Sequence, residues 1–158
     1  MSATSITDSR PDSGLRPAAV FLGFLTGGLL LEAMSPFPVL PEWLEPLIGG
    51  AALAAGVAIM ALRIAHWRAA GADGLASLRD SPPVARGVYG FSRNPTYVAM
   101  AAFYLGVAAW VDSLWLILLF LPLVLVLRWG VVAREEAYLS AKFGLAYERY
   151  CARVPRWL

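Results

Sequence analysis

The sequence predicts an all-α integral membrane protein with about four membrane helices, and two observations support this prediction. Of its 158 residues, 59% are hydrophobic and only 15% are charged, whereas a soluble domain carries about a quarter charged residues. The apolar residues also gather in long segments separated by polar stretches rich in proline and glycine. Too few polar side chains remain to cover a water-facing surface, so the bilayer is the expected solvent.

The N-terminal residues 1–16 are expected to form a mobile tail, because they are rich in Ser, Thr, Asp, Pro and Arg and lack apolar periodicity. The rest of the chain, 17–158, is expected to be a single domain. Its first membrane helix is predicted at 17–34, where Pro17 suits a first helical turn. A signal peptide is the alternative, but the segment is long for one and no small-x-small cleavage site follows.

Three further membrane helices are predicted, at 47–66, 95–111 and 114–133. A proline-rich loop precedes the first of these, whose glycines and alanines would let another helix approach closely. Only a short polar break separates the other two, so they are expected to form a tight antiparallel hairpin. Pro122 is expected to kink the last one.

Residues 134–150 have a helical pattern but are strongly charged, so they cannot span a membrane. We predict a cytoplasmic amphipathic helix there, with Gly144 as a point where it breaks in two. All thirteen Lys and Arg residues fall on one side of this topology. Because positive charge stays on the cytoplasmic side, we expect both termini and the working face in the cytoplasm, in a cell inner membrane.

The composition also limits which metals, disulfides and binding partners can be expected. The single cysteine, Cys151, excludes an intrachain disulfide and a cysteine-based zinc site. The lone histidine, His66, cannot build a metal centre and is interpreted as an interfacial side chain, so no metal is expected. The basic face suits anionic lipid headgroups. No nucleic-acid motif is present, and nucleic acid is not an expected partner.

Two polar stretches, 82–97 and 128–150, are the candidates for chemistry, and the predicted hairpin brings them to one membrane face. Glycine and proline let a ligand approach the backbone. Carboxylates and tyrosine rings favour a cation, whereas arginine favours a carboxylate or phosphate. Such a pocket suits a zwitterionic or sulfonium ligand beside an anionic one. The alternative is that these side chains only reach the interface from helix ends.

Residues 87–97, Gly-Val-Tyr-Gly-Phe-Ser-Arg-Asn-Pro-Thr-Tyr, resemble the G-x-Y-x-x-x-R-[HN]-P-x-Y motif of membrane methyltransferases. The run 134–136, Arg-Glu-Glu, followed by Phe143-Gly144, Tyr147 and Tyr150, resembles their C-terminal E-E…F-G-x-x-Y-x-x-Y signature. These motifs are typical of the isoprenylcysteine carboxyl methyltransferase and phospholipid methyltransferase superfamily. The resemblance covers about 67–158.

This resemblance implies an enzyme that uses S-adenosylmethionine and is built on membrane helices. Carried over position by position, it implies cofactor-binding roles for Pro83, Val84, Tyr89, Arg93, Asn94, Pro95, Thr96, Tyr97, Glu135 and Glu136. It implies catalytic roles for Arg128, Arg134 and Glu135.

The sequence also departs from the family pattern. Asn94 stands where the eukaryotic enzymes have histidine and cannot titrate, so a proton role is not expected there. The arginine thought to bind the substrate carboxylate aligns with Val131. Arg128, three residues earlier on nearly the same helical face, or Arg134 is expected to replace it. The G-x-G of phosphatidylethanolamine methyltransferases is absent.

The expected reaction is therefore carboxyl O-methylation of an isoprenylcysteine-type lipophilic acceptor. An ionised carboxylate needs no general base, whereas an amine or thiol would, and the sequence offers no obvious one. The alternatives are a phospholipid or other small-molecule N- or S-methyltransferase, a relative of NADPH-binding sterol-type reductases, or a non-catalytic membrane protein. The sequence does not specify the oligomeric state.

Overall fold

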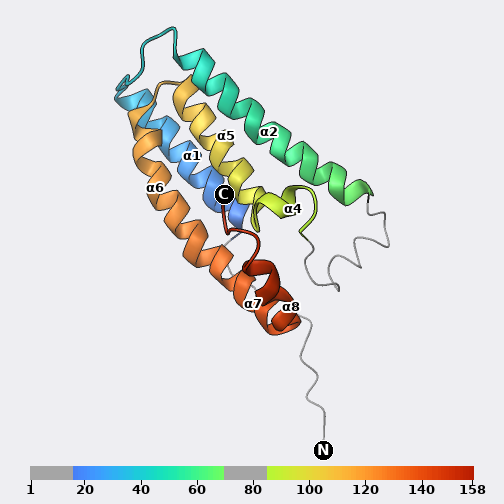
Figure 1. Ribbon diagram of the computed structural model, residues 1–158. Helices are drawn as coiled ribbons and strands as arrows, with labels where there is room; N and C mark the ends of the chain where they lie inside the picture. The colour runs from blue at the N-terminus through green and yellow to red at the C-terminus, as the bar shows by residue number, and fades with distance from the viewer. Residues whose placement is uncertain (1–15, 70–84) are drawn as a thin grey trace, which may run out of the picture.

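The computed structural model describes residues 16–69 and 85–158, and every regular element in these ranges is helical. Four long helices form a bundle (Figure 1): α1 (Pro17–Met34), α2 (Glu45–Ala69), α5 (Pro95–Trp110) and α6 (Leu114–Leu127). The predicted tail lies outside the described residues except for Arg16. The predicted all-α class is confirmed.

Among the described residues, three helical runs are long and apolar enough to cross a membrane, namely Pro17–Met34, Glu45–His66 and Leu114–Phe143. The fourth, Pro95–Trp110, is apolar but shorter, at roughly 24 Å of helix. Large apolar side chains point outward along these helices, with Leu30 60% and Leu121 63% exposed. An aqueous surface would not tolerate so much apolar exposure, so the chain is an integral membrane protein.

The helices pack in two pairs, α2 along α5 and α1 along α6, with α5 also against α6. The close approach of α2 to α5 depends on small residues, as predicted. A Cβ built on Gly49 would lie 2.7 Å from the backbone nitrogen of Trp110, and one on Gly106 would lie 2.7 Å from that of Leu53. The core between the pairs centres on Tyr104, whose ring meets Phe21 edge-on at 5.9 Å.

One end of the bundle is closed by Asp112, in the turn between α5 and α6. Its backbone adopts φ 50°, and its carboxylate is buried. Oδ1 accepts hydrogen bonds from the backbone N–H groups of Val39 (2.9 Å) and Leu40 (2.8 Å), and Oδ2 accepts one from Val39 (3.0 Å). The α1–α2 loop is thereby joined to the α5–α6 turn. Trp115 adds a 2.7 Å bond from its indole N–H to the carbonyl of Ser35.

The opposite end carries the short helices α4 (Val88–Phe91), α7 (Ala133–Phe143) and α8 (Leu145–Cys151). The sequence places the end of the last membrane helix at 133, and α7 begins at Ala133 without a break from the helical turn before it. One helical run extends over Leu114–Phe143, and α6 continues into α7 through a π-helical turn, η1 (Arg128–Val132). Gly130 lies within this turn but does not end the helix, because a π turn takes up an extra residue without interrupting the helical run. Gly144, at φ 49°, separates α7 from α8, as predicted.

Candidate functional site

The two polar stretches that the sequence placed on one membrane face do meet. The Tyr97 hydroxyl, in the first turn of α5, donates a 3.3 Å hydrogen bond to Oε2 of Glu135 on α7. Arg93 Nη1 lies 3.3 Å from Oε1 of Glu136. The Tyr150 hydroxyl on α8 donates a 2.9 Å bond to the carbonyl of Tyr89. The α5–α6 hairpin and its extension into α7 therefore assemble one polar site at this end of the bundle.

The segment before α5 has a local structure that presents these residues. Gly87 begins the single-turn α4 at φ 55°, a conformation that favours glycine, and a Cβ there would lie 3.3 Å from Nδ1 of His66. The buried Ser92 hydroxyl accepts a 3.1 Å bond from the Asn94 backbone N–H. Pro95 then starts α5, where its missing N–H costs nothing.

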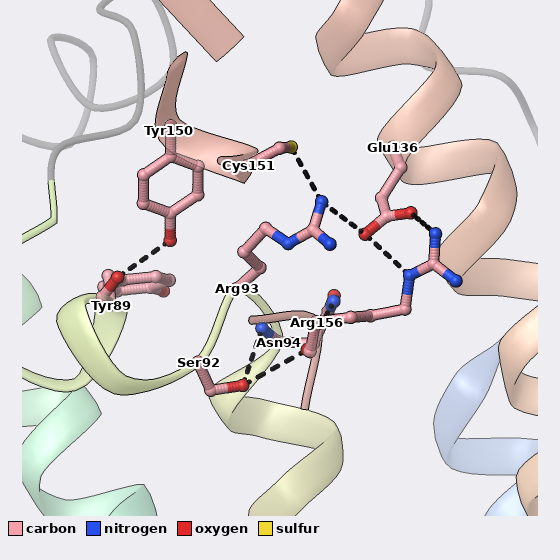
Figure 2. A network of polar contacts seen from close by, with 8 residues as sticks. All are labelled: Tyr89, Ser92, Arg93, Asn94, Glu136, Tyr150, Cys151 and Arg156. Carbon is pink, nitrogen blue, oxygen red and sulfur yellow. Dashed lines mark hydrogen bonds and ion pairs between the residues drawn. The ribbon is translucent and has the colours of Figure 1, made fainter. Parts of the chain in front are cut away.

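Glu136 is the centre of the network in Figure 2. Arg156 binds its carboxylate with two hydrogen bonds, Nε to Oε1 at 3.1 Å and Nη2 to Oε2 at 2.6 Å. Arg93 approaches the same carboxylate and also donates to Cys151 Sγ at 2.7 Å. These hydrogen bonds to Glu136 raise the pKa of the Arg156 guanidinium. One carboxylate, only 13% exposed, thus ties together α7, the segment before α5 and the C-terminal end.

The C-terminal residues run across the start of α5. The Arg156 carbonyl accepts bonds from the Asn94 amide Nδ2 (3.2 Å) and the Ser92 hydroxyl (3.3 Å), and the Pro155 carbonyl accepts one from the Arg93 N–H (3.0 Å). The Trp157 ring meets Tyr97 edge-on at 6.4 Å. The Asn94 side-chain amide therefore binds the C-terminal end of the chain.

An aromatic group borders the site on the α2 side. The rings of His66 and Tyr89 lie 5.8 Å apart, and Tyr150, which donates to the Tyr89 carbonyl, is buried. Burial, and next the nearby Tyr89, raise the pKa of Tyr150 to about 12. Burial and then the neighbouring Cys151 also raise the pKa of Tyr147. Both phenols therefore stay neutral at physiological pH.

The remaining predicted site residues lie outside the network of contacts around Glu135 and Glu136. Arg128 and Arg134 are exposed, and the Arg128 guanidinium lies 6.0 Å from the Trp129 ring centroid. Val131, by contrast, is only 3% exposed, so Arg128 does not share its face as expected. The widened π turn between them shifts the helical register. Thr96 is half-buried in the first turn of α5, and Pro83 and Val84 lie outside the described residues.

Sequence reasoning missed two residues of this region. His66, which the sequence places at the interface, also packs against Tyr89. Arg63, one turn earlier on α2, falls level with the first turn of α5 in the register that sets Gly49 against Trp110 and Gly106 against Leu53. The sequence marks Arg63 and His66 only as a charged and a titratable side chain at the end of an apolar helix. Nothing in that pattern indicates that α2 brings them to the start of α5.

The donor set suits an organic cation better than a metal ion. No group of three or more His, Cys, Asp or Glu side chains capable of holding a metal occurs in residues 16–69 and 85–158. A carboxylate bonded to a tyrosine hydroxyl favours a sulfonium or ammonium group, and the neighbouring aromatic rings of Tyr89 and His66 are of a type that stacks on an adenine. The residues present therefore fit S-adenosylmethionine in chemical type.

These features define a helical integral membrane protein with an acidic, tyrosine-containing site at one end of its bundle. The chain belongs to the phospholipid methyltransferase family, whose sequence model matches residues 47–146. This match includes most of α2, the whole motif at 87–97, all of α7 and the C-terminal signature as far as Gly144, and the family is that of a membrane methyltransferase.

A second comparison is more local. A stretch of 35 residues is 51% identical to an uncharacterized protein of Haemophilus influenzae and covers 22% of this chain and 56% of that protein. The chain thus spans little more than half the length of this relative. No solved structure matches the chain.

Proposed function

We propose that the protein transfers the methyl group of S-adenosylmethionine to a lipophilic acceptor, an isoprenylcysteine-type carboxylate, at the cytoplasmic membrane face. The observation that supports this proposal is the 3.3 Å hydrogen bond between Tyr97 and Glu135. It joins the two family motifs at one point, with the basic ends of the helices around it. The family membership supplies the reaction class.

S-adenosylmethionine would supply an activated methyl group carried on a sulfonium. Glu135 and Tyr97 would bind its positively charged part, while Tyr89, Thr96 and the backbone of 94–97 would surround it together with Pro83 and Val84. Glu136 would act indirectly, because its carboxylate holds Arg93 and Arg156 in place. Holding donor and acceptor in line contributes up to about 7–11 kcal/mol in model reactions, so positioning alone is a substantial catalytic effect.

A carboxylate acceptor fits these residues because it is already ionised and requires no general base. Arg128 or Arg134 would orient its charged end, since both are exposed on the helical run that carries Glu135. The acceptor would enter from the bilayer between helices. The placement of every Lys and Arg on one side of the topology supports a cytoplasmic site and cytoplasmic termini, in an inner membrane.

Calorimetric titration in detergent with S-adenosylmethionine, or with its demethylated product S-adenosylhomocysteine, tests the proposal. We expect saturable binding that Glu135→Gln weakens. The matched variant Glu42→Gln, in the exposed α1–α2 loop, should bind as wild type does. Wild-type protein that gives no heat at millimolar ligand would overturn the proposal and would favour a non-catalytic protein or a relative of the NADPH-binding reductases.

A phospholipid amine is the second candidate acceptor, because the family is described as phospholipid methyltransferases. An amine headgroup would need to lose a proton before or during attack. His66 is the one imidazole of the chain and lies beside Tyr89. A screen with labelled methyl donor against prenylated cysteine and phosphatidylethanolamine separates the two candidates.

A further inference from the structure

The loop between α1 and α2, residues 35–44, has an apolar surface. Large exposed apolar side chains form this surface and the helix ends beside it, namely Met34, Phe37, Val39, Trp43 and Leu47. Phe37, in the middle of the loop, is 57% exposed. The apolar surface runs on to α1 through Met34 and to α2 through Leu47, so it is continuous with the lipid-facing surface of both helices.

The backbone of this loop needs no water. The Ser35 N–H donates to a carbonyl of α1 at 2.9 Å, and the Phe37 N–H donates to Oε1 of Glu32 at 3.2 Å. The next two donors along the loop bond the Asp112 carboxylate. The other three residues of 35–41 are prolines, which have no N–H. Water satisfies such donors on a solvent-exposed loop, whereas in lipid the protein must satisfy them itself.

The length of α5 places this end of the bundle inside the membrane. Helix α5 has 16 residues, so it is roughly 24 Å long, whereas the hydrocarbon core is about 30 Å thick. Its first turn lies beside the charged side chains of Arg93 and Glu135, which require water or lipid headgroups. The Asp112 turn at its other end therefore stops about 6 Å short of the opposite boundary, and any tilt takes it deeper.

The α1–α2 loop covers this polar turn. Asp112 is 7% exposed and Ser113 is fully buried. The Phe37 carbonyl accepts a 3.3 Å bond from the Leu114 N–H, and the indole of Trp115 bonds the loop as described above. The loop thus shields the turn from lipid, and the Asp112 carboxylate in turn satisfies loop donors that lipid could not.

We propose that the α1–α2 loop is inserted in the bilayer, with Phe37 and Val39 among the lipid acyl chains and Asp112 covered beneath them. The partner of this surface is lipid hydrocarbon, because the surface continues that of the membrane helices and its backbone donors are bonded internally. Trp43, beside Glu42 at the far end of the loop, suits the headgroup level. The inference concerns the end remote from the candidate site and does not depend on methyl transfer.

Spin labels report whether the loop lies in lipid, in water or against protein. A cysteine replaces Phe37 or Val39 in a Cys151→Ser background, and the labelled full-length protein is reconstituted in vesicles of phosphatidylcholine and phosphatidylglycerol. Oxygen concentrates in lipid and a nickel chelate in water, so the accessibility of each label to the two agents is compared. Leu30→Cys on α1 is the lipid reference, and Glu148→Cys on α8 is the water reference.

We expect the oxygen-to-nickel ratio of both loop labels to match that of Leu30→Cys and to exceed that of Glu148→Cys. A ratio like that of Glu148→Cys places the loop in water and overturns the proposal. Low accessibility to both agents places the loop against protein, such as a second copy of the chain, and overturns it as well.

A second measurement keeps Cys151 and applies should the Cys151→Ser background fail to fold. Phe37→Trp is made in the otherwise unchanged chain, and its added fluorescence is taken as the difference from wild type. Phosphatidylcholine brominated in its acyl chains should quench this fluorescence, and water-soluble acrylamide should not. Quenching by acrylamide alone overturns the insertion of the loop.

Two variants test Asp112, whose backbone adopts φ 50°. Asp112→Asn keeps Oδ1, which accepts both loop N–H bonds, whereas Asp112→Gly removes the acceptor and tolerates this backbone angle. With the label at Phe37, Asp112→Gly should lower the oxygen-to-nickel ratio toward that of Glu148→Cys, because two N–H groups would lose their partner in lipid. Asp112→Asn should keep the original ratio. An unchanged ratio in Asp112→Gly, with its helix content retained by circular dichroism, overturns the role of Asp112 in holding the loop.

Discussion

Tyr97 and Glu135 are 38 residues apart in the sequence, yet the tyrosine hydroxyl donates a hydrogen bond of 3.3 Å to the glutamate carboxylate. The bond connects the first turn of α5 with the first turn of α7. Helix α6 and the π turn between them carry the chain from one to the other. The candidate site therefore depends on the length of one continuous helical run, Leu114–Phe143.

Tyr97→Phe should weaken binding of S-adenosylhomocysteine by roughly 2- to 12-fold. Removing the hydroxyl deletes one long hydrogen bond of 3.3 Å, and a typical hydrogen bond is worth about 0.5–1.5 kcal/mol. Calorimetry in detergent measures the change. Tyr138→Phe, on α7 but outside the network, serves as the matched control. Equal affinity of Tyr97→Phe and wild type would show that Tyr97 does not position Glu135 for the donor.

Glu136→Gln should lower the stability of the protein by about 1–3 kcal/mol, because Arg93 and Arg156 would lose their shared charged partner. Thermal unfolding in detergent reports this change. Glu148→Gln removes the same charge at an exposed position of α8 and should have little effect. If the two variants unfold at the same temperature, the Glu136 network contributes no stability.

Tyr150 should make the protein sensitive to alkali. Its pKa is raised from 10.0 to about 12 in the folded chain, chiefly by burial. Between these two values the unfolded chain loses the phenol proton first, so stability falls as the pH rises through that range. Below about pH 10 the full contribution is present.

Unfolding midpoints at pH 8, 10 and 12 test this pH dependence. Tyr150→Phe should unfold somewhat earlier than wild type at pH 8, because it loses the 2.9 Å bond to the Tyr89 carbonyl. Its further loss between pH 10 and 12 should be smaller than that of wild type. An identical alkaline slope for the two proteins would contradict the assignment to Tyr150.

Gly106→Ala should destabilise the bundle by about 1–3 kcal/mol. The new Cβ would lie 2.7 Å from the Leu53 backbone nitrogen, so α2 and α5 would have to separate. Gly23→Ala is the control, since a Cβ on Gly23 of α1 meets nothing within 4 Å. That change should be neutral or stabilising by up to about 1 kcal/mol. Gly106→Ala unfolding no earlier than Gly23→Ala would refute the close packing of α2 on α5.

The sequence alone was sufficient for the bundle and for the meeting of the two motifs. Long apolar runs bounded by proline and glycine mark helices, and the two-residue break at Asp112 and Ser113 leaves no arrangement but a hairpin. The π turn was not foreseen because Arg128–Val132 contains no residue type that specifies it. The same turn explains why Arg128 and Val131 lie on different faces.

The partners of the paired acids could not be predicted either. Neighbouring residues on a helix point about 100° apart, so one acid of the pair faces each side. Glu135 meets Tyr97 and Glu136 meets Arg93 and Arg156, but the opposite assignment fits the sequence equally well. The choice depends on the rotation of α7, which tertiary packing sets. The same holds for Arg63, whose position depends on the α2–α5 register.

Asp112 restricts how this molecule can change shape. Its carboxylate joins the α1–α2 loop to the α5–α6 turn at the end of the bundle remote from the site. The α1–α6 and α2–α5 pairs are thus held together at that end. We therefore expect the two pairs to separate by pivoting about the Asp112 end, which would open the space between them toward the candidate site. Such a pivot would admit long chains sideways from the lipid. Weakening the Asp112 contact should change how fast molecules exchange between the bilayer and the protein. It should not change which molecules the protein binds.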